Sequence, residues 1–308
     1  MIKNKNVVVT GGAGFLGRHV CEELQKYNPA SVFVVRSKEY DLREKQDIVR
    51  LLDKSKPDIV IHLAAVVGGI GANKENPGRF FYENAIMGIQ LIEAARVAGV
   101  DKIVSVGTIC SYPKFATTPF VEEELWDGYP EETNAPYGLA KKMLLVQSQA
   151  YKQQYNFNAV TLLPANLYGP WDNFDPSSSH VIPALIRKVL EAQAENRSEI
   201  EAWGTGSATR EFLHVQDAAR GIVLATENYN ESDPVNLGTG REISIKALLE
   251  MICDVCEFDG KINWNVNQPD GQPRRVLNTE KAKSFGFEAQ IALLDGIRET
   301  VTWYKEQL

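Results

Sequence analysis

Two residues whose spacing could support proton transfer, Tyr137 and Lys141, begin a segment, 137–155, whose pattern predicts a helix. Residues four apart lie on one face of a helix. An ammonium beside a phenol stabilises the phenolate and lowers the pKa of the phenol, so we expect Tyr137 to exchange protons near neutral pH. Thr108 follows an apolar strand-like run and can offer its hydroxyl to the same oxygen. These three residues predict chemistry at a carbonyl group.

A glycine turn supplies a second chemical signal. Gly11, Gly14 and Gly17 follow the apolar run 7–10 and open a helical pattern. The first glycine of such a turn permits the bend, the second lets the backbone approach a pyrophosphate, and the third lets helix and strand pack closely. The helix N-terminus adds amide donors and a positive dipole end. We therefore expect a dinucleotide here, contacted by Gly11, Gly14, Phe15, Leu16 and Gly17; a turn without a ligand is the alternative.

The end of the second strand-like run, 31–36, favours NADP over NAD. An NAD site usually has an acidic residue at this position to bond the ribose hydroxyls. Here the run ends in Arg36, and a guanidinium suits a 2′-phosphate. A solvated strand end is the alternative for Arg36. We assign Asp41 and Leu42, just beyond, to the adenine edge of the pocket.

The elements that position these residues alternate along the first half of the chain. Helical patterns separate apolar runs, and such runs are typical of a parallel sheet that is covered on both faces. The predicted fold class is therefore α/β, a Rossmann-type doubly wound parallel sheet over residues 1–165. Beyond Pro164 the alternation weakens, so residues 166–308 are predicted to form a smaller C-terminal α/β substrate-binding region, with some segments returning to the first domain. The predicted strands are 7–10, 31–36, 58–64, 102–106 and 159–163, and the main predicted helices are 16–27, 84–97, 137–155 and 293–308.

Composition excludes several classes of protein. The 308 residues carry a net charge of −7 with mixed signs, so we expect no nucleic-acid partner. No apolar run reaches the length of a membrane span, and the N-terminus does not resemble a signal peptide. Four scattered cysteines suit a cytoplasmic protein, and Cys253 and Cys256 lie in an apolar helical pattern that indicates core packing. The histidines show no ligand spacing, so we expect no metal.

The glycine turn, Thr108, Tyr137 and Lys141 together resemble the extended short-chain dehydrogenase/reductases, in their sugar-nucleotide branch, over essentially the whole chain. Three further segments, 64–70, 108–114 and 179–185, are similar to the GDP-L-fucose synthase family, the GDP-4-keto-6-deoxy-mannose 3,5-epimerase/4-reductases. In that family the catalytic hydroxyl is typically a serine, and Thr108 keeps the hydroxyl.

The resemblance implies roles for two more residues, Cys110 and His180, as the base and acid of the two epimerisations. Each alone would usually be structural, because cysteine is among the most buried residue types and a lone histidine is usually a hydrogen-bonded structural residue. Tyr137 would protonate the oxygen at C-4 as hydride arrives, with Lys141 and Thr108 assisting. The implied NADP site also includes Ala64, Ala65, Lys141 and His180. A ketone at C-4 acidifies the protons at C-3 and C-5, so one site can run epimerisation and reduction in sequence.

The resemblance also implies a GDP-linked keto sugar as substrate. Arg210 would meet the diphosphate, Trp203 would flank the nucleotide-sugar, and Lys188 or Arg187 would lie near the guanine. Basic residues of this kind can instead form surface ion pairs. The complete set of implied substrate residues is Asn166, Lys188, Trp203, Arg210 and Arg275.

Two other functions stay open. One is a related sugar-nucleotide 4-ketoreductase with one or no epimerisation, and the other is a non-catalytic NADP-binding regulator on the same fold. Tyr137 and Lys141 argue against the regulator, and Cys110 and His180 argue against a simple reductase. Family members often form homodimers through the helices predicted here at 84–97 and 137–155, so a homodimer is expected.

Overall fold

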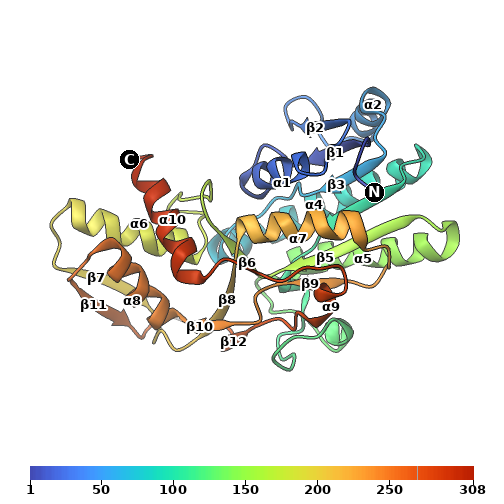
Figure 1. Ribbon diagram of the computed structural model, residues 1–308. Helices are drawn as coiled ribbons and strands as arrows, with labels where there is room; N and C mark the ends of the chain where they lie inside the picture. Colours follow the sequence, from blue (N-terminus) through green and yellow to red (C-terminus); the bar gives the residue numbers. More distant parts are fainter. Residues whose placement is uncertain (269) are drawn as a thin grey trace.

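A six-stranded parallel sheet forms the centre of the larger part of the molecule, in a computed structural model that describes residues 1–268 and 270–308, without the side chain of Ile70 (Figure 1). The strand order is β2-β1-β3-β4-β5-β9, so the order reverses between β1 and β3. Ligands of doubly wound sheets bind at the carboxyl ends of the strands at such a reversal. The strands are β1 (Asn6–Thr10), β2 (Ser31–Val35), β3 (Ile59–His62), β4 (Lys102–Val106), β5 (Asn158–Pro164) and β9 (Val235–Leu237).

Helices cover both faces of this sheet, as the apolar strands require. Along β1, Val7 and Val9 pack in one core with α1 and α7, whereas Val8 packs in a second core with α2 and α4. The alternation follows from the pleat, which points successive side chains to opposite faces. The helices of this part are α1 (Phe15–Gln25), α2 (Lys45–Ser55), α3 (Ile70–Glu75), α4 (Pro77–Val97), α5 (Ala135–Tyr155), α7 (Val215–Asn228) and α9 (Glu280–Lys283), with short 3-10 helices η1 (Ile109–Ser111) and η2 (Glu122–Trp126).

A smaller part with its own core lies to one side (Figure 1). Its central strand, β8, pairs antiparallel with β10 and parallel with both β12 and β6. Strands β7 and β11 form a separate parallel pair. The elements here are β6 (Asn166–Tyr168), α6 (Val181–Ala194), β7 (Glu199–Trp203), β8 (Thr209–His214), β10 (Glu242–Ser244), α8 (Ile245–Cys256), β11 (Lys261–Asn265), β12 (Arg274–Arg275) and α10 (Leu293–Lys305).

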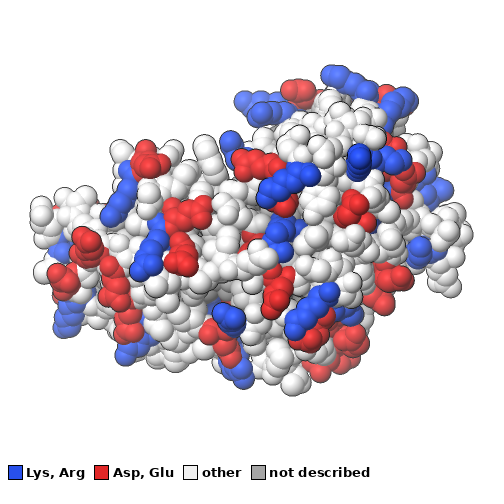
Figure 2. Space-filling view, in the orientation of Figure 1, with Lys and Arg blue, Asp and Glu red and all other residues white. Residues whose placement is uncertain are grey.

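The predicted fold class is confirmed, and the differences lie at element ends. Helix α4 begins at Pro77, seven residues before its predicted start at Asn84. Its first turns hold three consecutive aromatic residues, Phe80–Tyr82, which show no helical spacing, but proline is well suited to the first turn of a helix. Cys253 and Cys256 are buried, unpaired residues of α8, as predicted. Among the described residues, no helix combines the length and hydropathy needed to cross a membrane. Acidic and basic side chains are interspersed on the face shown in Figure 2.

Candidate active site

The glycine turn between β1 and α1 has the backbone geometry that a dinucleotide requires. Gly11 has a φ of +70°, a conformation that favours glycine. A Cβ on Gly17 would lie 2.1 Å from the carbonyl oxygen of Gly11, so only glycine lets α1 approach this closely. Gly14 is the N-cap of α1 and has no side chain that could bond to the first backbone amides of the helix. Phe15 and Leu16 are the first two residues of that turn. Exposed amides at a helix N-terminus fit a pyrophosphate.

The segment after β2 contains a basic residue, Arg36, without a carboxylate partner in the described chain and an acidic residue, Asp41, that is paired. Arg36 is exposed just beyond β2, and no carboxylate oxygen of the described chain lies within 4.0 Å of it. Asp41 is bound by the Arg43 guanidinium at 2.6 Å, and this hydrogen bonding lowers the pKa of the carboxyl. Leu42 is buried in the core. Arg36 is therefore available to an anion, whereas the Asp41 carboxylate braces its own segment.

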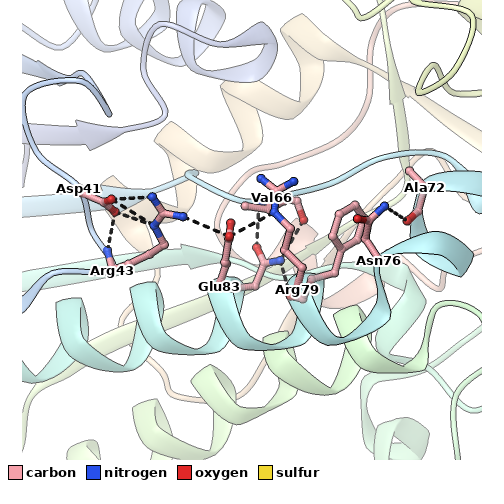
Figure 3. Close-up of polar contacts among 9 residues, drawn as sticks. Asp41, Arg43, Val66, Ala72, Asn76, Arg79 and Glu83 are labelled. Atoms are coloured by element: carbon pink, nitrogen blue, oxygen red, sulfur yellow. Dashed lines mark hydrogen bonds and ion pairs between the residues drawn. The ribbon is translucent and has the colours of Figure 1, made fainter.

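That bracing extends to the loop after β3, as Figure 3 shows. Arg43 reaches Glu83 of α4 at 3.1 Å, and Arg79 approaches the same carboxylate at 3.1 Å. The next residue, Asn84, forms two 2.9 Å hydrogen bonds with the main chain of Val66. Helix α4 therefore fixes the loop that begins at Ala64 and Ala65.

A buried histidine that sequence reasoning did not select lies beneath this loop. His62, at the end of β3, forms a 2.8 Å hydrogen bond with Thr10, and Thr10 also accepts the amide of Ala64 at 3.2 Å. Burial, and secondarily the ammonium of Lys141, lower the pKa of His62 to about 3, so the imidazole is neutral. The sequence signal that could have identified His62 is its position as the polar last residue of an otherwise apolar strand.

Tyr137 and Lys141 lie in the first turns of α5. Lys141 is buried, and burial lowers the pKa of its ammonium to about 8. Tyr137 is half-buried; burial raises the pKa of the phenol, and the neighbouring Cys110 raises it further. The pKa of the phenol is therefore raised in this structure and not lowered as expected, because burial desolvates the phenolate. The phenol stays protonated and is a proton donor.

Thr108 and Cys110 are held against the same turn of α5. Thr108 caps η1 by accepting the amide of Cys110 at 3.1 Å. Ser111 donates its hydroxyl to the carbonyl of Gly138 at 3.0 Å. A Cβ on Gly138 would lie 2.5 Å from the carbonyl oxygen of Cys110, so α5 and η1 are in direct contact. This contact brings Thr108, Cys110 and Tyr137 together.

Two arginines from the smaller sheet complete this cluster. Arg210 of β8 and Arg275 of β12 are register partners, and Nη1 of Arg275 lies 3.6 Å from the sulfur of Cys110. Burial, and then the charge of Arg275, lower the pKa of Arg210 to about 10. Arg274 pairs with Glu242, whereas no described carboxylate oxygen lies within 4.0 Å of Arg210 or Arg275. The pair can therefore accept an anion.

His180 lies at the start of α6, and none of the polar contacts of the described residues joins its side chain to Tyr137 or Cys110. It is the N-cap residue of that helix and makes no capping hydrogen bond with its side chain. The preceding segment is tied to the loop after β3, because the amide of Gly69 donates to the carbonyl of Ser178 at 3.2 Å. The imidazole is exposed to solvent, yet the surrounding protein desolvates it enough to lower its pKa.

The other expected substrate residues are spread over the smaller part. Asn166 donates to the carbonyl of Glu211 at 2.9 Å, and Lys188 donates to that of Glu201 at 2.6 Å. Arg187 lies 3.7 Å from Glu191, the ion pair considered as its alternative. The side chain of Trp203, at the end of β7, is 66% exposed. Asn166 and Lys188 therefore already use one donor within the protein, whereas Trp203 is open to a ligand.

Comparisons with known proteins agree with this architecture. The model of the NAD dependent epimerase/dehydratase family matches residues 7–238. Probable GDP-L-fucose synthase 1 of Oryza sativa is 39% identical over 99% of this chain and 94% of its own length. A crystal structure of a GDP-6-OMe-4-keto-L-xylo-heptose reductase from C. jejuni is 29% identical with a TM-score of 0.93, covering 100% of this chain and 99% of that one. A GDP-L-fucose synthetase from Naegleria fowleri bound to NADP is 29% identical with a TM-score of 0.89, covering 100% and 96%. This chain therefore belongs to the NAD dependent epimerase/dehydratase family, in the group that contains the GDP-L-fucose synthases.

Proposed function

We propose that this protein converts GDP-4-keto-6-deoxy-D-mannose to GDP-L-fucose, by epimerisation at C-3 and C-5 and NADPH-dependent reduction at C-4. The observation that carries the proposal is the contact between Cys110 and Arg275 beside Tyr137. A reductase needs only a proton donor at the carbonyl oxygen, whereas an epimerase also needs a base for carbon-bound protons. A cysteine sulfur beside a guanidinium, next to the tyrosine, supplies that base.

Epimerisation uses the acidity of the two carbons that flank the C-4 ketone. The Cys110 thiolate takes a proton from the carbon on one face, and His180 returns a proton to the opposite face. The hydroxyls of Thr108 and Tyr137 hold the C-4 oxygen while it carries the negative charge of the enolate. The same arrangement serves C-3 and C-5 because both carbons are neighbours of that oxygen.

Reduction uses the proton that burial keeps on Tyr137. Bound NADPH supplies a hydride to C-4. Tyr137 donates its proton to the C-4 oxygen, and the ammonium of Lys141 stabilises the phenolate that remains. Lys141 carries that charge at neutral pH, since its pKa is about 8.

The proposed cofactor and substrate sites follow the free backbone amides and the arginines without carboxylate partners in the described chain. The free amides of the first turn of α1 receive the pyrophosphate, and Arg36 receives the 2′-phosphate that distinguishes NADP from NAD. The Naegleria fowleri relative bound to NADP supports the choice. Arg210, lacking a carboxylate partner in the described chain, binds the diphosphate of the GDP-sugar. The remaining proposed contacts are Gly11, Gly14, Phe15, Leu16, Gly17, Asp41, Leu42, Ala64, Ala65, Lys141 and His180 for the cofactor, and Asn166, Lys188, Trp203 and Arg275 for the substrate.

The proposal extends to the organisation of the chain. Residues 1–165 form the cofactor-binding domain, and residues 166–308 mainly bind substrate, with α7 and β9 returning to the first sheet. Helices α4 and α5 pair two copies in a homodimer, and the protein works in the cytoplasm. Exposed apolar side chains on these helices support pairing: Phe81, Tyr82, Val97, Met143, Val146 and Tyr155.

Reduction of GDP-4-keto-6-deoxy-D-mannose in deuterated water tests the function. NADPH oxidation is followed at 340 nm, and NMR locates deuterium in the product. Wild type is expected to consume NADPH and to place deuterium at C-3 and C-5. Cys110→Ser should lose the exchange, whereas Cys253→Ser, at a cysteine in the core of the smaller part, should keep it. NADPH oxidation without deuterium would favour a simple 4-ketoreductase, the activity in the name of the C. jejuni structure.

A further inference from the structure

Gln272, which precedes β12, connects three parts of the site through separate atoms. Its main-chain carbonyl accepts Nη1 of Arg210 at 2.6 Å. Its side-chain Oε1 accepts Nε of Arg275 at 2.7 Å. Its side-chain Nε2 donates to the carbonyl of Lys114 at 2.7 Å. One residue therefore touches both arginines and the segment that follows Cys110.

The bond from Gln272 to Arg275 decides where that guanidinium points. The guanidinium is a rigid plane, so a hydrogen bond at Nε fixes the direction of both terminal nitrogens. Nη1 then lies 3.6 Å from the sulfur of Cys110. Since no described carboxylate neutralises Arg275, its charge is available to the sulfur. The guanidinium thus places a hydrogen-bond donor and a positive charge beside the sulfur that would take the substrate proton.

The bond from Gln272 to Lys114 fixes the cysteine side of the contact between Arg275 and Cys110. Lys114 lies four residues after Cys110, beyond the end of η1, and its amide also bonds to the carbonyl of Tyr129 at 2.9 Å. The side chain of Gln272 thus holds the cysteine segment and the arginine strand at a fixed separation. Alanine at this position would release both segments while leaving the main-chain carbonyl for Arg210.

We infer that Gln272 is a positioning residue that holds Arg275 against the Cys110 sulfur and so keeps Cys110 ready to act as the base. The inference rests on the proposed function, because it concerns the base of the proposed epimerisation. A residue that only stabilised its loop would affect folding, but it would not act through Arg275.

The test compares Gln272→Ala, Arg275→Met and the double variant, with Gln46→Ala, an exposed glutamine of α2, as the matched control. Two rates are measured on each full-length protein: deuterium incorporation from solvent into substrate with NADPH present, and alkylation of Cys110 by iodoacetamide at pH 7, followed by peptide mass spectrometry. A hydrogen bond to a charged group corresponds to roughly a ten- to hundred-fold effect, so Gln272→Ala should slow both rates by about ten-fold or more. KM for the GDP-sugar should change by a smaller factor than either rate, because Arg210, the proposed diphosphate contact, keeps its main-chain anchor.

The double variant distinguishes positioning of Arg275 by Gln272 from a general stabilising effect of Gln272 on its loop. If Gln272 acts mainly through Arg275, removing Gln272 from Arg275→Met should slow both rates far less than removing it from wild type, because only the bond to Lys114 is then lost. Independent, multiplying effects would overturn the inference, and so would wild-type rates in Gln272→Ala. If wild type incorporates no deuterium, the proposed function fails. The alkylation rates then still decide whether Gln272 and Arg275 act together on the sulfur.

Discussion

Gly138 offers a direct test of how closely α5 must approach η1, because its replacement by alanine adds one atom at their contact. The new Cβ would lie 2.5 Å from the carbonyl oxygen of Cys110 and 3.0 Å from the carbonyl carbon. Ordinary contact begins near 3.4 Å, so the two backbones must separate by about 0.9 Å. Tyr137 is the preceding residue of the same turn and would move with the helix, away from Cys110 and Thr108.

The expected loss is in catalysis rather than in folding. A misplacement of about 1 Å at reacting groups costs roughly 100-fold in rate, so kcat of Gly138→Ala should fall by about that factor. Alanine favours the helix by about 0.5–1 kcal/mol over glycine, whereas overpacking costs about 1–3 kcal/mol. The free energy of unfolding should therefore fall by about 0–2.5 kcal/mol, which leaves a folded enzyme.

A second glycine provides the control. A Cβ on Gly88 of α4 would lie 2.5 Å from both methyl carbons of Leu144, the flexible end of a side chain in the α4–α5 contact. Gly88→Ala should lower the thermal midpoint while leaving kcat close to wild type. NADPH oxidation with the GDP-sugar gives kcat, and circular dichroism gives the melting curve. If Gly138→Ala keeps kcat within about three-fold of wild type, the close approach of Tyr137 to η1 is not what the reaction needs.

Three further predictions concern charge. Since burial lowers the pKa of Lys141 to about 8 and its protonated form is required, kcat/KM should fall above about pH 8. Lys141→Arg should shift this alkaline limb of the pH–rate profile to higher pH. An unchanged alkaline limb would contradict the role of Lys141. Arg36→Ala should weaken NADPH binding by about ten-fold or more without changing NADH binding, as measured by fluorescence titration; an equal loss for both cofactors would argue against a 2′-phosphate contact. The carboxylate of Glu211 accepts hydrogen bonds from the amides of Gly240, at 2.8 Å, and Leu277, at 2.6 Å. Glu211→Ala should therefore lower the free energy of unfolding, measured by urea titration, by about 3–5 kcal/mol. A loss below about 1 kcal/mol would show that these amides find other partners.

The features that sequence predicted well are those whose chemistry is local. The glycine turn lies between β1 and α1 because adjacent residues set its bend, and β3 was recognisable from its apolar run 59–61 for the same reason. The start of α4 was not, because the consecutive Phe80, Phe81 and Tyr82 show no helical spacing, and Pro77 and Gly78 are typical of turns. The protonation of Tyr137 was misjudged because spacing along a helix carries no information about desolvation.

The features that the sequence did not predict depend on contacts between residues far apart in the chain. Sequence resemblance assigned Arg275 to the substrate, but 165 residues separate it from Cys110, and their contact depends on tertiary packing that no local pattern reveals. Gln272 was not singled out at all, because a polar residue between Gly271 and Pro273 reads as an ordinary turn. Its three partners come from three different segments, which no local pattern can reveal.

This arrangement divides the chemistry between the two parts of the molecule. The groups that serve reduction, Tyr137 and Lys141, belong to one helix of the larger part and need only that helix to keep their spacing. The proposed base is different: Cys110 comes from the larger part, and the charge at its sulfur comes from Arg275 in the smaller part. A change that loosens β12 should therefore slow deuterium exchange before it slows hydride transfer to an already epimerised ketone. Comparing these two rates in one variant distinguishes a damaged base from a damaged reductase.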